Sequence, residues 1–181
     1  MSIKISIRNS LNQKSVKNHV FFTNKNFRIN EISKLPISKF SSFINQSLSS
    51  NELGNKNFLS LDINASQKVI LIKIKDGQSP FEIEKIGAEF YVYLKSNLYL
   101  KTTFYEQNIS NTSPKNRFFF DQFVQGLQLK SYEFNKYKSK SKEKKFDIEV
   151  LNKNKTFQFN RNKKYRSCLL YTSDAADDNR C

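Results

Sequence analysis

Alternating apolar and polar residues predict most of the strands in this chain. Ile3, Ile5 and Ile7 each stand between polar neighbours, which is the period of a half-buried strand. Three other segments combine short apolar runs with alternation and are predicted as strands as well: 19–22, 58–63 and 146–151. Residues 98–105 give a further strand. Residues 68–74 form a continuous β-branched run, which is typical of a strand covered on both faces.

Apolar residues at helical spacing predict helices between these strands. Residues 38–50 carry such a stripe and are expected to form a short amphipathic helix. The strongest local signal is Ser79-Pro80-Phe81-Glu82, which combines an N-cap hydroxyl, a proline at the first helical position and a glutamate that completes a capping box. Along the helix that follows, we predict that Gly87 allows close approach to the sheet. Ser113-Pro114 repeats the cap-plus-proline start and predicts a second long helix that runs to about Phe134.

The order of these elements predicts the fold class. Helices interleaved between apolar strands indicate an α/β domain with three layers, in which a mixed sheet is flanked by helices. The chain has 181 residues, 38% of them hydrophobic and including 17 Phe and 8 Tyr, which is enough for one domain with a sizeable core. No apolar run reaches the roughly 18 residues of a membrane-spanning helix, so we expect no membrane partner. The alternating start of the chain is also unlike a secretory signal.

The net charge of +15 raises the question of nucleic-acid binding. The cationic segment Lys136–Lys145, with Tyr132, Phe134 and Tyr137 beside it, has the residue types that grip a phosphate backbone and stack on bases. The alternative is a solvated loop, and we favour it because the positive charge is spread along the whole chain. Weak, sequence-blind attraction to nucleic acid is then the expectation.

The residues that could carry catalysis or bind a metal do not form a recognised pattern. His19 is the only histidine and is interpreted as a strand-end residue, and the candidate carboxylates stand singly on different elements: Asp62, Asp76, Asp121 and Asp147. No serine lies in a Gly-x-Ser-x-Gly elbow. The four glycines, Gly54, Gly77, Gly87 and Gly126, are too far apart for a phosphate-binding loop. The sequence therefore predicts no catalytic, cofactor-binding or metal-binding residue.

The C-terminal residues differ in composition from the rest of the chain. Residues 168–177 resemble the translation of a transposon-derived sequencing adapter, and we expect the genuine chain to stop near Ser167 in mid-gene. Both cysteines, Cys168 and Cys181, belong to this tail, so the remaining chain has no thiol chemistry. Residues 168–181 have no apolar stripe, and we expect them to lie off the domain.

One stretch carries a resemblance to a known family. Residues 123–140 read Phe-Val-Gln-Gly-Leu-Gln-Leu-Lys-Ser-Tyr-Glu-Phe-Asn-Lys-Tyr-Lys-Ser-Lys, which resembles the segment that closes the N-terminal domain of the leucyl aminopeptidase (cytosol aminopeptidase) family. Upstream, residues 68–74 and 84–91 resemble that domain's central strand and the helix after it. The resemblance implies that residues 1–160 are an N-terminal domain with a macro-domain-like fold. Residues 161–167 would then start a linker to a missing catalytic domain.

The resemblance also implies a function for the longer protein. Members of the family are cytoplasmic homo-hexamers that remove N-terminal amino acids from peptides with two divalent metal ions, manganese or zinc, in the second domain. The metal-binding and catalytic residues of that domain have no counterpart here, so this fragment is predicted to be inactive and to hold no cofactor. Lys75-Asp76-Gly77 stands where many relatives have a Gly-Leu-Gly turn, which argues against a ligand-binding loop. Two alternatives to the aminopeptidase fragment remain: a non-specific nucleic-acid-binding module and an ADP-ribose-type binder.

Overall fold

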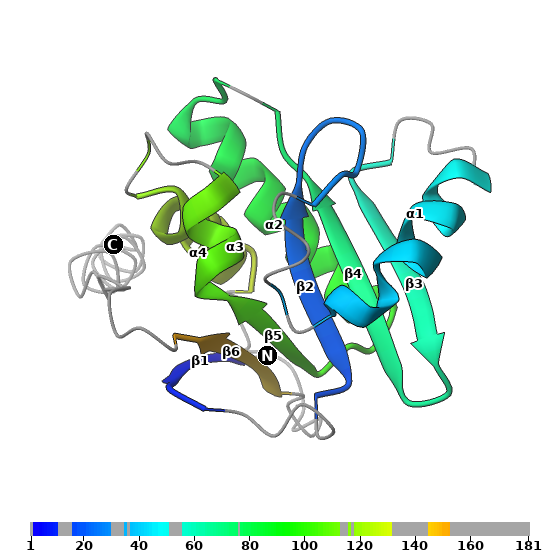
Figure 1. Ribbon diagram of the computed structural model, residues 1–181. Coiled ribbons are helices and arrows are strands. Elements are labelled where there is room, and N and C mark those ends of the chain that lie inside the picture. The colour runs from blue at the N-terminus through cyan, green and yellow to red at the C-terminus, as the bar shows by residue number, and fades with distance from the viewer. Residues whose placement is uncertain are drawn as a thin grey trace, which may run out of the picture.

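The computed structural model of this chain is built around a six-stranded sheet (Figure 1). The structure describes residues 2–10, 16–29, 35, 37–50, 56–75, 77–112, 116, 118–131 and 145–152. The strands lie in the order β1 (Ser2–Arg8), β6 (Lys145–Leu151), β5 (Lys101–Tyr105), β2 (Asn18–Thr23), β4 (Gln67–Lys73) and β3 (Phe58–Asn64). Every neighbouring pair is parallel except β3 with β4, which is antiparallel.

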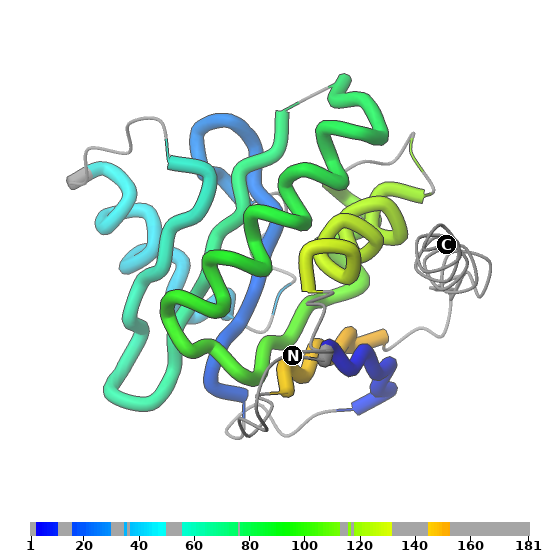
Figure 2. Tube along the Cα trace, turned by 180° about the vertical axis from the view of Figure 1, so that it is seen from behind, coloured from blue at the N-terminus to red at the C-terminus, as the bar shows by residue number. Residues whose placement is uncertain are grey.

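Helices cover both faces of this sheet (Figures 1 and 2). On one face lie α2 (Pro80–Ser96) and α4 (Phe119–Ser131), and α3 (Glu106–Thr112) adds Ile109 to the same core. On the other face lies α1 (Ser41–Ser50), preceded by the short 3-10 helix η3 (Ser38–Phe40). The predicted three-layer arrangement with a mixed sheet is therefore confirmed.

The start of α2 follows the sequence prediction. The Ser79 hydroxyl accepts the N–H of Glu82 at 3.3 Å, and the Glu82 carboxylate accepts the N–H of Ser79 at 2.8 Å. Pro80 occupies the first helical position, where its missing N–H costs no hydrogen bond. The capping box predicted from these four residues is confirmed.

The predicted role of Gly87 is only half right, because the close approach is to a helix and not to the sheet. A Cβ at Gly87 would lie 1.9 Å from the Phe123 backbone oxygen of α4. A Cβ at Gly126 of α4 would lie 1.8 Å from the Glu84 backbone oxygen of α2. The two helices thus cross with their backbones nearly touching, and each supplies a glycine at the crossing.

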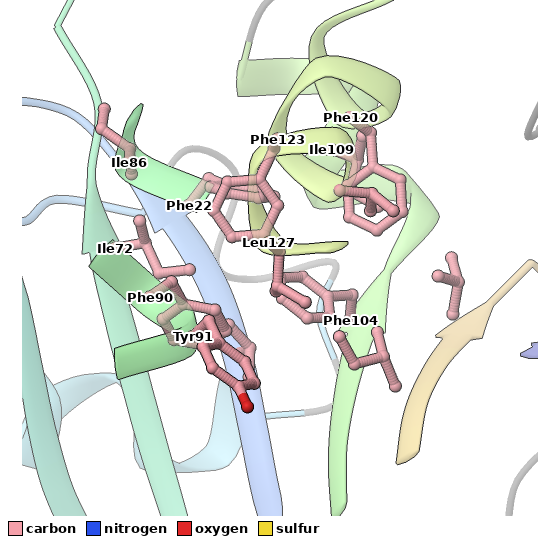
Figure 3. Packing of buried hydrophobic residues seen from close by; sticks show 14 of the residues in the cluster. Phe22, Ile72, Ile86, Phe90, Tyr91, Phe104, Ile109, Phe120, Phe123 and Leu127 are labelled. Carbon is pink, nitrogen blue, oxygen red and sulfur yellow. The ribbon is translucent and has the colours of Figure 1, made fainter. Parts of the chain in front are cut away.

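Aromatic rings fill the space between this helix pair and the sheet (Figure 3). Phe22 of β2 packs edge-on against Phe123 at a centroid distance of 5.0 Å and against Phe119 at 4.9 Å. Phe90 of α2 packs against both Phe104 and Phe123. Offset and edge-to-face pairs of this kind add stability beyond the area that they bury.

One helix and two boundaries differ from the sequence prediction. Helix α3 was not predicted, because only Asn108 and Ile109 of its residues are buried and no apolar stripe marks it. Helix α4 begins at Phe119, where Asn116 accepts the N–H of Phe118, and not at Ser113-Pro114, whose residues lie outside the described ones. Strand β5 begins at Lys101, later than predicted, because Leu98 adopts a left-handed conformation (φ 55°) that closes the end of α2.

Candidate functional site

The candidate residues singled out in the sequence lie far apart in the fold. Asp62 lies on the edge strand β3 and pairs with Lys68 of β4, Asp121 lies in the first turn of α4, and Asp147 lies on β6. Asp121 is half-buried, and its burial raises the pKa of its carboxyl to about 6. Asp76 lies outside the described residues. So do residues 132–144, which include all of the cationic segment except Lys145, and the tail with both cysteines.

His19 is the second residue of β2, one position from the strand end that the sequence predicted, and it is buried against Tyr105. The Nδ1 atom of His19 lies 2.5 Å from the Tyr105 hydroxyl, and the two rings stack at a centroid distance of 5.9 Å. Burial lowers the pKa of His19 to about 4 and raises that of Tyr105. The imidazole is therefore neutral at pH 7, and its Nδ1 shares a hydrogen bond with the Tyr105 hydroxyl.

A buried carboxylate lies two strands away on the same face. Glu149 of β6 is 4% exposed, and its carboxylate oxygens lie 3.6 Å from Arg8 Nε and 3.3 Å from Lys101 Nζ. Both cations are about half exposed. Thr103 of β5 stands between Glu149 and His19 in the strand register. Glu149, Thr103, His19 and Tyr105 together form a row of buried polar groups, called here the polar row.

The spacing of the polar row argues against a catalytic triad. His19 and Glu149 are separated by one intervening strand, which places their backbones about 10 Å apart, beyond hydrogen-bond reach. The Nδ1 atom of His19, which a carboxylate would orient in a triad, is already bonded to Tyr105. These residues do not meet the geometry that a general base and its orienting acid need.

The carboxyl ends of the parallel strands are the usual ligand-binding edge of such a sheet, at the point where the strand order reverses. In this chain that point lies between β2 and β5. Asn108 of α3 occupies it: its side-chain oxygen accepts the N–H of Phe22 at 2.8 Å, and its amide donates to the Phe22 carbonyl at 3.0 Å. The side chain continues the ladder of β2 where the pairing with β5 ends. A ligand at the reversal point would have to displace it.

Backbone donors elsewhere on this edge are also used internally. In the loop after β2, the Asn24 side-chain oxygen accepts the N–H groups of Asn26 and Arg28. After β4, Gln78 accepts the N–H of Lys75, and the bond from Ser79 holds the pKa of Glu82 below its ordinary value. The positive end of α2 thus already faces a carboxylate. The N–H groups of Asn26, Arg28, Lys75 and Ser79 are therefore not free to form the row of donors that cradles a phosphate.

Metal chemistry finds no support among the residues that the structure describes. Within them, no group of three or more His, Cys, Asp and Glu side chains is arranged to hold a metal ion. The three described aspartates lie on separate elements, and His19 is occupied by Tyr105. These residues do not fit a two-metal centre. None of the helices in the described part of the chain is both long enough and apolar enough to span a membrane.

Comparisons with known proteins identify the fold. No family model matches the sequence, and no curated protein matches it. Among solved structures, the chain is similar to a K354E mutant of tomato leucine aminopeptidase, with a TM-score of 0.57 and 15% identity over 84% of this chain. It is also similar to the macrodomain of Thermus aquaticus DarG (TM-score 0.50, 8% identity, 83% of this chain and 99% of that one). A third structure, alphavirus P23pro-zbd, has a TM-score of 0.54 and 10% identity over 96% of this chain and 24% of that one.

These similarities show a macro-like fold. The domain matches nearly the whole DarG macrodomain, so the macro-like arrangement expected from the sequence is confirmed. It spans only 33% of the aminopeptidase chain.

Proposed function

We propose that this chain is the non-catalytic N-terminal domain of a leucyl-aminopeptidase-type metallo-exopeptidase. One observation carries the proposal: 84% of this chain superposes on one third of an aminopeptidase chain. The stretch 123–140, which resembles the closing segment of that family's N-terminal domain, supports the same assignment independently of the coordinates.

The chemistry of the described residues is consistent with a domain that does no catalysis itself. Two-metal hydrolysis requires several carboxylates that converge on a metal pair about 4 Å apart. Here the described candidate carboxylates lie on separate elements, and Glu149, the one buried carboxylate among the described residues, faces two cations. We propose that the metal pair, the peptide substrate and the hexameric assembly in the cytoplasm belong to the longer protein.

The filled carboxyl edge favours this proposal over a nucleotide-type binder on the same fold. Asn108 blocks the reversal point of the strand order, and Glu82 caps the N-terminus of α2. A phosphate-bearing ligand would compete with both side chains.

The test is release of the chromophore from a chromogenic leucyl anilide by the purified chain, with excess manganese or zinc and with bound metal measured on the same sample. We expect no turnover above the metal-only blank and no tightly bound metal pair. A complete leucine aminopeptidase is the positive control. Turnover that tracks two bound metals per chain would refute the proposal. Extending the reading frame beyond Ser167 should restore activity together with two metals per chain.

A further inference from the structure

The carboxyl edge of the sheet, where Asn108 occupies the reversal point, also carries a group of cations. The Ile74 N–H donates to the Thr23 carbonyl at 2.8 Å, so the loops after β2 and β4 leave the sheet from adjacent points. Both loops lie at the upper end of the sheet in Figure 1, as does the start of α2. The charged side chains described there are cations: Lys25 and Arg28 after β2, Lys73 at the end of β4, and Lys75 after it. Lys25, Arg28 and Lys75 are exposed, and Lys73 is partly buried.

An exposed aromatic ring stands beside these cations. Phe81 lies in the first turn of α2 and is 75% exposed, more than any other large apolar side chain among the described residues. Lys85 follows it by four positions and is also exposed, so the two share one face of the helix. No packing requirement explains Phe81 at this position, because the stripe that contacts the core starts at Ile83.

The cations of this edge differ from those at the other end of the sheet. There, Lys68 pairs with Asp62 and Lys101 pairs with Glu149. Arg8, at the carboxyl end of β1, pairs with Glu149 as well. Around the ends of β2 and β4 and the start of α2, the described residues provide no close ion pair for Lys25, Arg28, Lys73, Lys75 and Lys85. Lys73 lies over the Phe27 ring at 5.2 Å, and Lys75 and Lys85 both help to lower the pKa of Glu82. The acids described there are Glu82, which caps α2, Glu106, which lies within hydrogen-bond distance of Ser110, and Glu89, which accepts from the Asn57 amide beside Lys73. Among the described residues, this edge therefore carries net positive charge.

The chemistry of this surface identifies its partner. The N–H groups of Asn26, Arg28, Lys75 and Ser79 already donate within the protein, so they cannot bind a single buried phosphate. Cations spread over a surface instead attract a chain of phosphates. An exposed ring among such cations is the platform on which an unpaired base stacks. We infer that the carboxyl edge binds single-stranded nucleic acid, with Phe81 stacked on a base and Lys25, Arg28, Lys73, Lys75 and Lys85 along the backbone. A duplex would satisfy the cations but not the ring, because its bases are already stacked.

The inference is tested by titrating the full chain into a fluorescent oligo-dT of about 12 nucleotides, within the site sizes known for single-strand binders. Phe81→Ala should weaken this binding about 5- to 100-fold and leave binding to a duplex of equal length almost unchanged. Phe118→Ala, which removes a ring that is 57% exposed at the start of α4, is the matched control and should bind like the parent. Phe81→Tyr should retain affinity, which shows that any loss in Phe81→Ala comes from the ring and not from misfolding.

Charge is tested by two triple variants that change net charge equally. Lys25→Glu/Arg28→Glu/Lys75→Glu should abolish binding to both nucleic acids at low salt, whereas Lys4→Glu/Lys17→Glu/Lys145→Glu should weaken it only slightly. Equal losses in the two triples would overturn the inference, because the attraction would then be diffuse. Equal binding by Phe81→Ala and the parent would overturn it as well, and so would competition by polyglutamate as strong as that by oligo-dT. Neither readout depends on peptidase activity, so this inference and the proposed function stand or fall separately.

Discussion

Phe21 and Phe22 are adjacent in β2, and they face two different kinds of interior. Phe22 enters the face covered by α2 and α4, where it contacts four aromatic rings: Phe104, Phe119, Phe120 and Phe123. Phe21 enters the opposite face, covered by α1, where its ring contact is the stacked Tyr105, which itself bonds to His19. The α2/α4 face is held together by aromatic packing and a close helix crossing. The opposite face combines a smaller apolar cluster with the polar row, so its order depends more on hydrogen bonds and charge pairs.

The largest loss of stability is expected for Phe22→Ala, and comparison with Phe21→Ala tests the two faces directly. Phe22→Ala should lower the free energy of unfolding by about 4 to 5 kcal/mol, because it leaves a cavity and removes several ring contacts. Phe21→Ala, the matched change one residue earlier, should cost about 3 kcal/mol. Urea unfolding of both variants gives the difference. Equal losses would mean that the aromatic cluster adds nothing beyond burial.

The crossing of α2 and α4 at Gly87 and Gly126 tests how tightly the α2/α4 face is packed. Gly126→Ala should cost about 3 kcal/mol, because its Cβ would meet the Glu84 backbone at 1.8 Å and the helices must separate. Gly77→Ala is the control: its φ of 73° is unfavourable for alanine but no atom lies within 4 Å, so about 1 kcal/mol is expected. Chemical denaturation measures both. A Gly126→Ala variant as stable as Gly77→Ala would show that the crossing can relax.

Local signals in the sequence were sufficient to predict most helices and strands, but not the contacts between them. Ser79 to Glu82 specifies the start of α2 within four residues, and the apolar run of β4 indicates burial on both faces, so both were predicted correctly. Asn108 bonds to Phe22 across 86 residues, as His19 does to Tyr105, and such pairs depend on a strand register that the sequence does not reveal. For the same reason Gly87 could be predicted to allow a close approach, but not to which element.

The two faces should also respond oppositely to acid. His19 has a folded pKa of about 4, below its unfolded value near 6.5, so the unfolded chain takes up a proton first as pH falls from about 6.5 to 4. That uptake should lower the free energy of unfolding by about 2 to 3 kcal/mol. Asp121 has a folded pKa of about 6, above its unfolded value, so the folded state takes up a proton first and gains stability as pH falls through the same range. Its half-exposed position reduces this gain to about 1 kcal/mol.

Single variants separate the two contributions. In Asp121→Asn the loss of stability between pH 6.5 and 4 should be steeper than in the parent, and in His19→Gln it should be shallower. The measurement is the urea midpoint across this pH range at constant ionic strength. Identical pH profiles for the parent and His19→Gln would show that His19 does not titrate as its burial implies.

The smallest effect compares two neighbouring threonines that face opposite sides of β5. The hydroxyls of Thr102 and Thr103 are both buried, and neither has a hydrogen-bond partner among the described residues. Thr102 faces the aromatic side next to Ile148, so Thr102→Val removes an unpaired polar group at constant shape and should stabilise the fold by up to about 1 kcal/mol. Thr103 lies between Glu149 and His19 in the strand register, on the same face as the buried carboxylate. Thr103→Val should therefore be neutral or destabilising by up to about 1 kcal/mol, because a methyl group there leaves the carboxylate in more apolar surroundings. Thermal unfolding at pH 7 resolves the sign of each change. A gain in stability for both would mean that the polar row derives nothing from its central hydroxyl, and that the two faces differ in aromatic content alone.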